Sequence, residues 1–202
     1  RILVASLLLF NEQGEPGTTT NEIADEVDIS PGNLHYHFRK KEQVVTALLY
    51  EFKADAKRVL QPPEIDAVTI DDFWVFLHLL LECTAAYRFL FRDLESLSER
   101  YPRVQRVLGH FAKGLAAIFE IYLRQLATSG LLVISDDDAA IIARNLAVIA
   151  LFSERFDGLT GQATTADDSA LRVAGSILNA LKPLTADDAA AHIEDLAAHY
   201  DA

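Results

Sequence analysis

The sequence predicts an all-α fold, in which a small N-terminal group of helices is followed by a larger helical bundle. Apolar residues recur at helical spacing along most of the 202 residues, and no segment alternates apolar and polar residues as a half-buried strand does. The chain has only six prolines, 50% of its residues are hydrophobic and 24% are charged, which is typical of a globular protein. A chain of this length can bury a substantial core.

The first two helices are expected on either side of a short loop. Apolar residues over 2–13 indicate an amphipathic helix that ends at the Gly14-Glu15-Pro16-Gly17 loop. Thr19 and Thr20 are suitable N-cap residues for a second helix, and Glu22 follows within one turn. The apolar face of this second helix consists of Ile23, Ala24 and Val27.

A third helix, of unusual composition, is expected after a tight turn. Ser30 is an N-cap residue, and Pro31 stands at the first helical position, where the N–H that proline lacks would be unpaired in any case. Leu34 and Phe38 form an i, i+4 apolar stripe, so we expect both in the core. The other side chains are small, aromatic or hydrogen-bonding, and the basic run 39–41 follows them. This pattern favours a helix that enters a major groove between phosphates.

The remaining helices are bounded by caps and by helix breakers. The Pro62-Pro63 pair ends the fourth helix and is the strongest break in the chain. Ser135, Thr165 and Thr185 each precede aspartates and are expected to cap the last three helices. The expected ranges are 41–61, 69–97 with a kink near Tyr87, 102–128, 136–156, 166–181 and 187–200.

Two side-chain clusters suggest metal sites, but each has a better explanation. The aspartates at 136–138 complement a helix dipole, and the same pattern recurs at 167–168 and 187–188. His35 and His37 lie at i and i+2, about 200° apart on a helix, whereas zinc-binding helices use i, i+4 spacing. We also find no nucleophile–base motif and no phosphate loop. We therefore expect no metal, no cofactor and no enzymatic activity.

Composition also bears on the compartment. No apolar run reaches the roughly 18–20 residues that span a bilayer. The start, Arg1 followed by ILVASLLLF, lacks the cleavage site of a signal peptide and suits an amphipathic helix better. Because the chain opens on Arg1 and not on Met, we expect that a further piece, such as a basic arm, precedes it. The single Cys83 excludes an internal disulfide and is consistent with the cytoplasm.

The net charge of −12 counts against simple nucleic-acid binding. Residues 1–47 carry four Lys or Arg against seven acids. The position of the cations matters more than their sum, and the run 39–41 is well placed at the end of the third helix. We therefore expect a small number of phosphate contacts and modest affinity for non-specific DNA.

Residues 18–30 (TTTNEIADEVDIS) and 31–49 (PGNLHYHFRKKEQVVTALL) together resemble the helix-turn-helix of the tetracycline-repressor (TetR) family of bacterial transcription regulators. The resemblance covers roughly residues 1–50. It implies a three-helix DNA-binding domain over residues 1–47 and a larger domain for effector binding and dimerisation over 48–202. His35 departs from the tyrosine that is common in the family, so sequence preference at that position is expected to be particular to this chain.

The candidate DNA-binding residues combine local reasoning with the resemblance. Thr20 lies at a helix N-terminus, where backbone N–H groups favour an anion. The resemblance implies phosphate contacts for Tyr36, His37 and Lys41, with packing against the first helix as the alternative for Tyr36. It also implies that three residues of the third helix face base edges. The full set is Thr20, Ser30, Gly32, Asn33, His35, Tyr36, His37 and Lys41.

Two further sets follow for the C-terminal domain. The resemblance implies that helices of this domain surround an effector cavity. The aromatic and polar candidates on these helices are Trp74, His78, Cys83, Tyr87, Phe111, Phe119 and Tyr122. Small and large apolar residues suited to close packing with a second copy are Leu146, Ile149, Ala150, Ser153, Leu171, Ala174, Gly175 and Leu178. For both sets the alternative is packing within one subunit.

The resulting hypothesis is a homodimeric, cytoplasmic DNA-binding regulator. By resemblance it is a repressor that leaves a palindromic operator when a small hydrophobic effector binds. The competing hypothesis is a helical ligand-binding or scaffold protein whose hairpin has lost DNA affinity, which the acidic N-terminal region supports.

Overall fold

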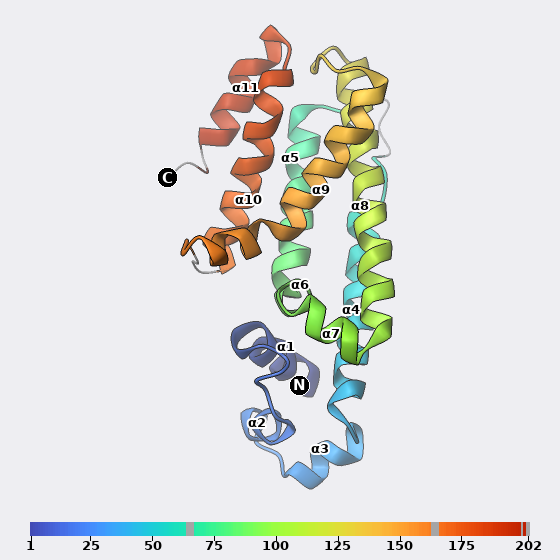
Figure 1. The fold of residues 1–202 in the computed structure, drawn as a ribbon, viewed down its shortest axis with the longest axis vertical. Helices are drawn as coiled ribbons and strands as arrows, with labels where there is room; N and C mark the ends of the chain where they lie inside the picture. The colour runs from blue at the N-terminus through green and yellow to red at the C-terminus, as the bar shows by residue number, and fades with distance from the viewer. Residues whose placement is uncertain (64–66, 163–165, 199, 201–202) are drawn as a thin grey trace. The chain divides into compact units, whose positions relative to one another are not determined.

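A computed structural model describes residues 1–63, 67–162, 166–198 and 200, and confirms the all-α prediction for them (Figure 1). Within these residues the exceptions to helix are turns, loops and one isolated antiparallel bridge between Leu132 and Thr185. The helices are α1 (Ile2–Gln13), α2 (Thr20–Glu26), α3 (Pro31–His37), α4 (Lys41–Val59), α5 (Ile70–Ala86), α6 (Arg88–Arg92), α7 (Leu94–Arg100), α8 (Pro102–Thr128), α9 (Asp136–Leu159), α10 (Ala166–Leu181), the 3₁₀ turn η1 (Lys182–Leu184) and α11 (Asp187–Ala198).

The chain forms two compact units. The N-terminal unit consists of Arg1–Lys57 and Ala86–Gly109. Its core joins the apolar faces of α1 to α4 with those of α6 and α7, and the Phe10 and Phe89 rings lie 5.3 Å apart. The predicted apolar face of α2 is confirmed, since its three members are at most 5% exposed.

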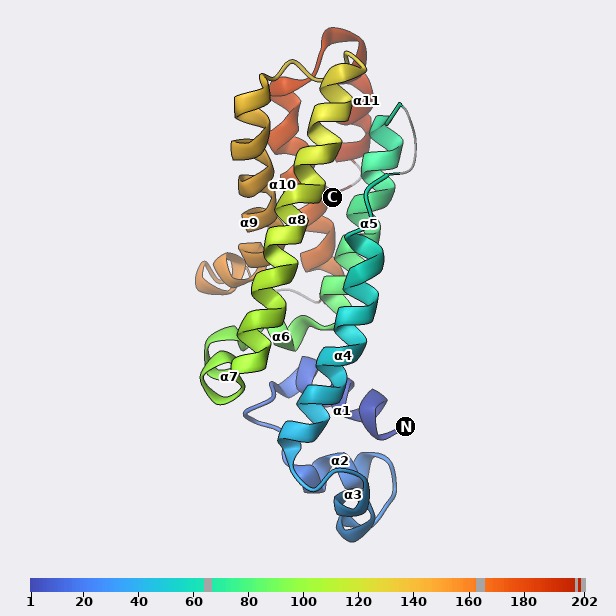
Figure 2. The same cartoon turned by 90° about the vertical axis from the view of Figure 1, so that its right-hand side faces the viewer.

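The C-terminal unit consists of Arg58–Ala85 and His110–Ala202. Figures 1 and 2 show α9 and α10 side by side, with α5 and the second half of α8 running alongside them. Its core is rich in aromatic rings from α5 and α8 and in aliphatic side chains from α9 to α11. No helix among the described residues is both long enough and apolar enough to cross a bilayer.

Most predicted helices are found close to their expected ends. The helix expected over 69–97 is divided instead into α5, α6 and α7, with breaks at Tyr87 and Asp93. Phe38 was expected in the core, but it ends α3 as the C-cap residue and is half-buried. Thr165, the expected cap of α10, lies outside the described residues.

Candidate nucleic-acid interface

The α2 helix begins with the predicted cap. The Thr19 side chain accepts a hydrogen bond from the Glu22 backbone N–H at 3.2 Å, and the Glu22 carboxylate accepts one from the Thr19 backbone N–H at 2.6 Å. The hydrogen bonds that the Thr19 backbone N–H and hydroxyl donate to this carboxylate lower the pKa of Glu22. The cap residue is therefore Thr19, while Thr20 is the first residue of the helix and is half-buried.

A tight turn joins α2 to α3. Asp28 has a φ of 53°, in the left-handed region, and the Ile29 N–H donates to the Ala24 carbonyl at 3.0 Å. Ser30 then caps α3, since its hydroxyl oxygen accepts from the Asn33 N–H at 3.2 Å. The turn chemistry and the position of Pro31 agree with the prediction.

The α3 helix is anchored by one side chain and exposed elsewhere. Leu34 is 0% exposed, whereas Tyr36 is 85% exposed and its ring meets that of His37 edge-on at 5.4 Å. A Cβ added to Gly32 would contact only the Ser30 hydroxyl, at 3.8 Å, so the backbone is open to close approach there. All predicted contact residues within α3 are exposed, namely Gly32, Asn33, His35, Tyr36 and His37.

Lys41 differs from the other cations after α3. Its ammonium donates to the carbonyls of Glu15 and Thr18, both at 2.7 Å, and lies 3.3 Å from the Glu15 carboxylate. An ammonium has three N–H donors, so these partners within the chain satisfy it. Arg39 and Lys40 are exposed. Lys41 thus holds the α1–α2 loop against the start of α4, and a phosphate contact by it stays a prediction.

Glu15 is a buried carboxylate that the sequence reasoning missed. It is 0% exposed and receives bonds from Arg100 and from the Tyr101 hydroxyl, the latter at 2.9 Å, in addition to Lys41. Burial, followed by the bond to Glu15, raises the pKa of Tyr101 to about 12. These partners are more than 25 residues away in sequence, so the only local signal was an acid in a loop with proline and glycine.

A second polar contact fixes the same loop. Arg92 donates to the carbonyls of Phe10 and Asn11 at 2.7 and 2.8 Å, which satisfies the C-terminal end of α1. The Asp93 carboxylate accepts from the Glu15 backbone N–H at 3.0 Å. Side chains at the junction of α6 and α7 therefore hold the loop that precedes the helix-turn-helix.

The candidate effector residues are mostly core in this structure. Phe119 and Tyr122 pack against Phe73 and Phe76, and the Phe76 and Tyr122 rings stack at 4.8 Å. Burial raises the pKa of Tyr122. Cys83 and Phe111 are also buried, and Tyr87 belongs to the N-terminal unit, where it donates to Asp55 at 2.7 Å.

Two candidate effector residues are more open. Trp74 and His78 are half-buried on α5, one turn apart, with ring centroids 4.1 Å from each other. The Trp74 indole N–H donates to the Tyr200 hydroxyl at 2.7 Å. These two therefore form the accessible part of the predicted set.

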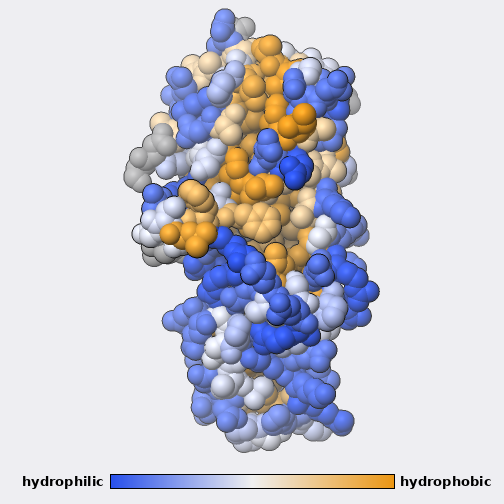
Figure 3. Space-filling view, in the orientation of Figure 1, coloured by the Kyte–Doolittle hydropathy of each residue, from blue (hydrophilic) through white to orange (hydrophobic). Residues whose placement is uncertain are grey.

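The candidate dimer residues divide by burial. Ile149 and Ser153 are half-buried and Leu171 is exposed. The other five are buried within this subunit, and a role for them in a dimer stays a prediction: Leu146, Ala150, Ala174, Gly175 and Leu178. The apolar side chains that remain exposed on α9 lie on its other face, at Ile141, Val148, Phe152, Phe156 and Leu159. Figure 3 shows the corresponding apolar surface over α9.

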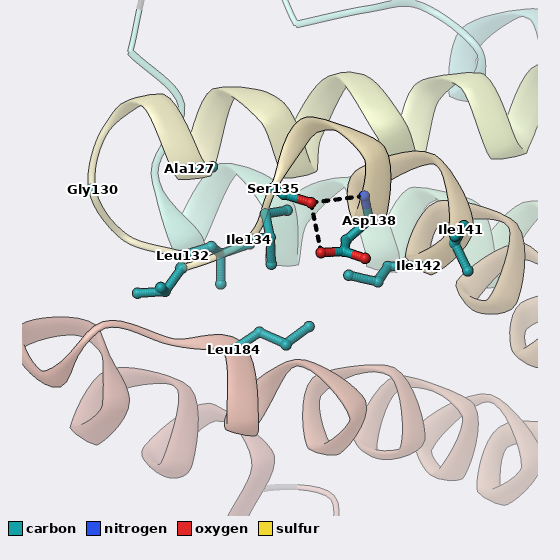
Figure 4. A pocket seen from close by; sticks show the side chains of 10 residues that line it. Ala127, Gly130, Leu132, Ile134, Ser135, Asp138, Ile141, Ile142 and Leu184 are labelled. Carbon is teal, nitrogen blue, oxygen red and sulfur yellow. Dashed lines mark hydrogen bonds between the residues drawn. The ribbon is translucent and has the colours of Figure 1, made fainter.

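A hollow that the sequence did not predict lies where the α8–α9 and η1 turns meet (Figure 4). Its volume is about 740 Å³, and its lining includes Leu132, Ile134, Ile142 and Leu184. The polar groups in view are engaged, because the Ser135 hydroxyl donates to the Asp138 carboxylate at 2.6 Å and accepts from the Asp138 N–H at 3.2 Å. Ser135 is thus the N-cap of α9, as expected, with the aspartates in the first turn, and Asp136 pairs with Arg124.

Comparisons with known proteins bear on this geometry. A family model described as "Bacterial regulatory proteins, tetR family" matches residues 2–48, and a TetR model described as "Bacterial transcriptional repressor" matches residues 51–193. The negative transcriptional regulator IcaR of the biofilm operon of Staphylococcus epidermidis is 24% identical over 129 residues, which is 64% of this chain and 63% of that protein. The transcriptional regulator YvkB of Bacillus subtilis is 28% identical over 134 residues, 64% of this chain and 66% of that protein. The chain thus spans slightly less than two thirds of these relatives.

Solved structures share the whole fold. A TetR-family transcriptional regulator from Marinobacter aquaeolei VT8 superposes with a TM-score of 0.87 at 27% identity, covering 98% of this chain and 96% of that chain. The TetR-family protein CprB from Streptomyces coelicolor, solved in complex with its operator, gives a TM-score of 0.67 at 19% identity, covering 98% and 93%. At the lower identity the likeness concerns the fold alone.

Proposed function

Because this chain belongs to the tetR family of bacterial transcriptional regulators, we propose that it is a homodimeric, cytoplasmic repressor of a palindromic operator. The observation that carries the proposal is α3, a helix that is exposed except for Leu34 and is held between two caps. A helix with so little of its surface buried is suited to enter a major groove. A small hydrophobic effector is proposed to release the DNA.

The proposed readout uses short side chains near the start of α3. Asn33 can pair bidentately with adenine, and the open backbone at Gly32 admits a thymine methyl. In this proposal Tyr36 and His37 bind phosphates that flank the major groove, and the half-buried Thr20 adds a phosphate contact at the N-terminus of α2. His35 reads a base edge in a way particular to this chain.

Few cations serve this interface. Arg39 and Lys40 are exposed, while the Lys41 ammonium is engaged within the chain. The logarithm of the affinity should therefore fall only gently with the logarithm of the salt concentration, since the slope scales with the number of phosphates neutralised.

The proposed dimer uses the exposed face of α9. Val148, Phe152, Phe156 and Leu159 recur at spacings of four, four and three residues, which makes one stripe along the helix. Two copies of such a stripe form a self-complementary two-fold interface. A two-fold dimer also lets two α3 helices meet successive major grooves, about 34–36 Å apart.

The interface test is a charge placed on this stripe. Phe152→Glu should give a monomer in sedimentation equilibrium and weaken operator binding, because a carboxylate would be buried without a partner. Val4→Glu alters an α1 side chain that is also exposed and serves as the matched control. A Phe152→Glu protein that stays dimeric at micromolar concentration would refute this interface.

The proposed effector response is a shift between two populations. An effector that binds the C-terminal unit more tightly in one state than in the other favours that state, and DNA affinity changes by the same coupling free energy. Trp74 and His78 are the side chains best placed to meet such a ligand, because they are aromatic and polar and only half-buried.

DNA binding is tested by selecting duplexes from a random pool on the purified chain, then titrating the preferred duplex at fixed salt. Asn33→Ala should weaken binding to that duplex about 5- to 100-fold and leave random DNA little affected. Tyr36→Ala should weaken both, and Tyr50→Ala, an exposed tyrosine on α4, is the matched control. Selection of no duplex over random DNA at equal salt would refute the proposal.

The alternative function is a helical ligand-binding or scaffold protein with weak or lost DNA binding. The exposed acids of α2 and its turn favour it, since Glu22, Asp25, Glu26 and Asp28 lie close to α3 in the sequence and repel phosphates. The same selection separates the two functions. Under the alternative, ligands stabilise the chain although no duplex is preferred.

A further inference from the structure

Tyr200 makes a paired contact with α5 that its distance in sequence gives no reason to expect. Its hydroxyl accepts a hydrogen bond from the Trp74 indole N–H at 2.7 Å and lies 3.2 Å from His78 Nε2. The Tyr200 and His78 rings meet edge-on, with centroids 6.1 Å apart and planes at 88°. Burial raises the pKa of Tyr200.

A glycine on α10 makes room for the stem of this side chain. A Cβ added to Gly175 would lie 3.0 Å from the Tyr200 Cβ, closer than nearly all real contacts of this kind. A side chain at 175 would therefore require the tyrosine to shift by at least a few tenths of an ångström. Tyr200 lies after the end of α11, and α11 is held to α5 by His192, whose Nε2 lies 2.9 Å from the Asp71 carboxylate.

We propose that Tyr200 occupies, from within the chain, a binding site for a monohydroxylated aromatic ring that Trp74, His78 and Gly175 form. The inference rests on the proposed effector response and names the chemical class of the effector. The site offers one donor, the indole N–H, and one imidazole nitrogen, His78 Nε2, which accepts when the ring proton is on Nδ1; both meet at the position of a single oxygen. A phenol hydroxyl satisfies both at once, because it accepts one hydrogen bond and donates another.

The same pairing rejects rings without a hydroxyl. A methyl group in place of the hydroxyl would leave the indole N–H and the imidazole nitrogen without partners in a half-buried setting. Specificity of this kind comes from polar groups that the wrong ligand leaves unpaired. The site should therefore distinguish p-cresol, which reproduces the tyrosine side chain from its Cβ outward, from p-xylene, which has nearly the same shape.

Tyr200 and a ligand exclude each other from this site. An occupant tethered to the chain reduces the apparent affinity of a free ligand by the fraction of time that the site is open. Tyr200→Ala should therefore raise the affinity for p-cresol by about five- to tenfold over the original chain. Tyr200→Phe keeps the ring but loses the hydroxyl, so its affinity should fall between the two.

The site contains its own reporter, because Trp74 is the only tryptophan in the chain. We would titrate the original chain, Tyr200→Ala and Tyr200→Phe with p-cresol and with p-xylene, exciting Trp74 where the ligands do not absorb. Tyr50→Ala, which removes an exposed tyrosine of α4, is the matched control and should behave as the original chain does. Circular dichroism checks that each variant is folded.

The expected result is saturable binding of p-cresol, with the highest affinity in Tyr200→Ala. In that variant the affinity for p-cresol should be about five- to tenfold higher than the affinity for p-xylene. Equal binding of the two ligands would overturn the proposal, since it would indicate only an apolar gap left by the substitution. An unchanged p-cresol affinity in both Tyr200 variants would also overturn it. No DNA is present, so these outcomes are independent of the duplex selection that tests the regulator itself.

Discussion

Glu15→Gln is the most informative perturbation of the N-terminal unit. The substitution keeps the shape of the side chain and removes its charge. Glu15 is 0% exposed, and in place of water it has Arg100, Lys41 and the Tyr101 hydroxyl. An amide oxygen can keep the bond from Tyr101, but it cannot pair with the two cations.

The expected loss in the free energy of unfolding depends on how well solvent can hydrate the Arg100 and Lys41 side chains once the Glu15 charge is gone. Removing one member of a fully buried ion pair costs about 3–5 kcal/mol. The Arg100 and Lys41 side chains are 40% and 23% exposed, so solvent and the two loop carbonyls compensate them in part. We therefore expect Glu15→Gln to lower the free energy of unfolding by about 2 kcal/mol. With a urea m-value of about 2 kcal/mol per M, the midpoint should fall by about 1 M.

The assay is urea unfolding followed by circular dichroism at neutral pH. Glu12→Gln removes the charge of an exposed glutamate on α1 and is the matched control, expected to be within about 0.5 kcal/mol of the original chain. If the midpoint of Glu15→Gln fell no further than that of Glu12→Gln, the carboxylate would not stabilise the unit and our reasoning would be refuted. A changed m-value would indicate that the two-state treatment fails.

Three further predictions concern the same unit. Because the pKa of Tyr101 is raised to about 12, its protonated hydroxyl stabilises the folded chain below pH 10, and this stabilisation is lost as pH rises toward 12. Tyr101→Phe should therefore reduce the loss of stability between pH 10 and 12, followed by thermal unfolding, by about 1–2 kcal/mol. An unchanged pH profile would contradict this. Thr19→Ala should cost about 1 kcal/mol in urea unfolding through loss of the α2 cap, with Thr128→Ala, an exposed threonine of α8, as the comparison. Asp28→Gly should be neutral or stabilising by up to about 1 kcal/mol, because φ is 53° there, while Asp28→Val should destabilise; the reverse order would disprove strain at this turn.

The local elements could be read from the sequence because their signals are local. Capping pairs such as Thr19 with Glu22, the Ser30-Pro31 start of α3 and the spacing of apolar residues act within one or two helical turns. The exposed composition of α3 also followed, since only Leu34 and Phe38 were apolar there. Phe38 was misplaced because the helix ends before it, and its backbone turns away as the C-cap.

The roles that depend on a distant partner could not be read in this way. Glu15 looked like a solvated loop residue, although Arg100 and Tyr101 bury it from 85 and 86 positions away. On α9 the periodicity shows two apolar faces without showing which of them is buried within the subunit, and the structure places Leu146 on the buried face and Phe152 on the exposed one.

By itself, then, the sequence determined the helical class and the two helices on either side of the turn, because short-range capping and periodicity specify them. The residues at 18–49 also carried the resemblance to the family. Only the tertiary structure decided which cations stay exposed near α3, which face of α9 is open and that Tyr200 lies against Trp74 and His78. Those outcomes depend on which surfaces are removed from water when distant segments pack together. The order of residues along one helix does not show which distant segment will cover it.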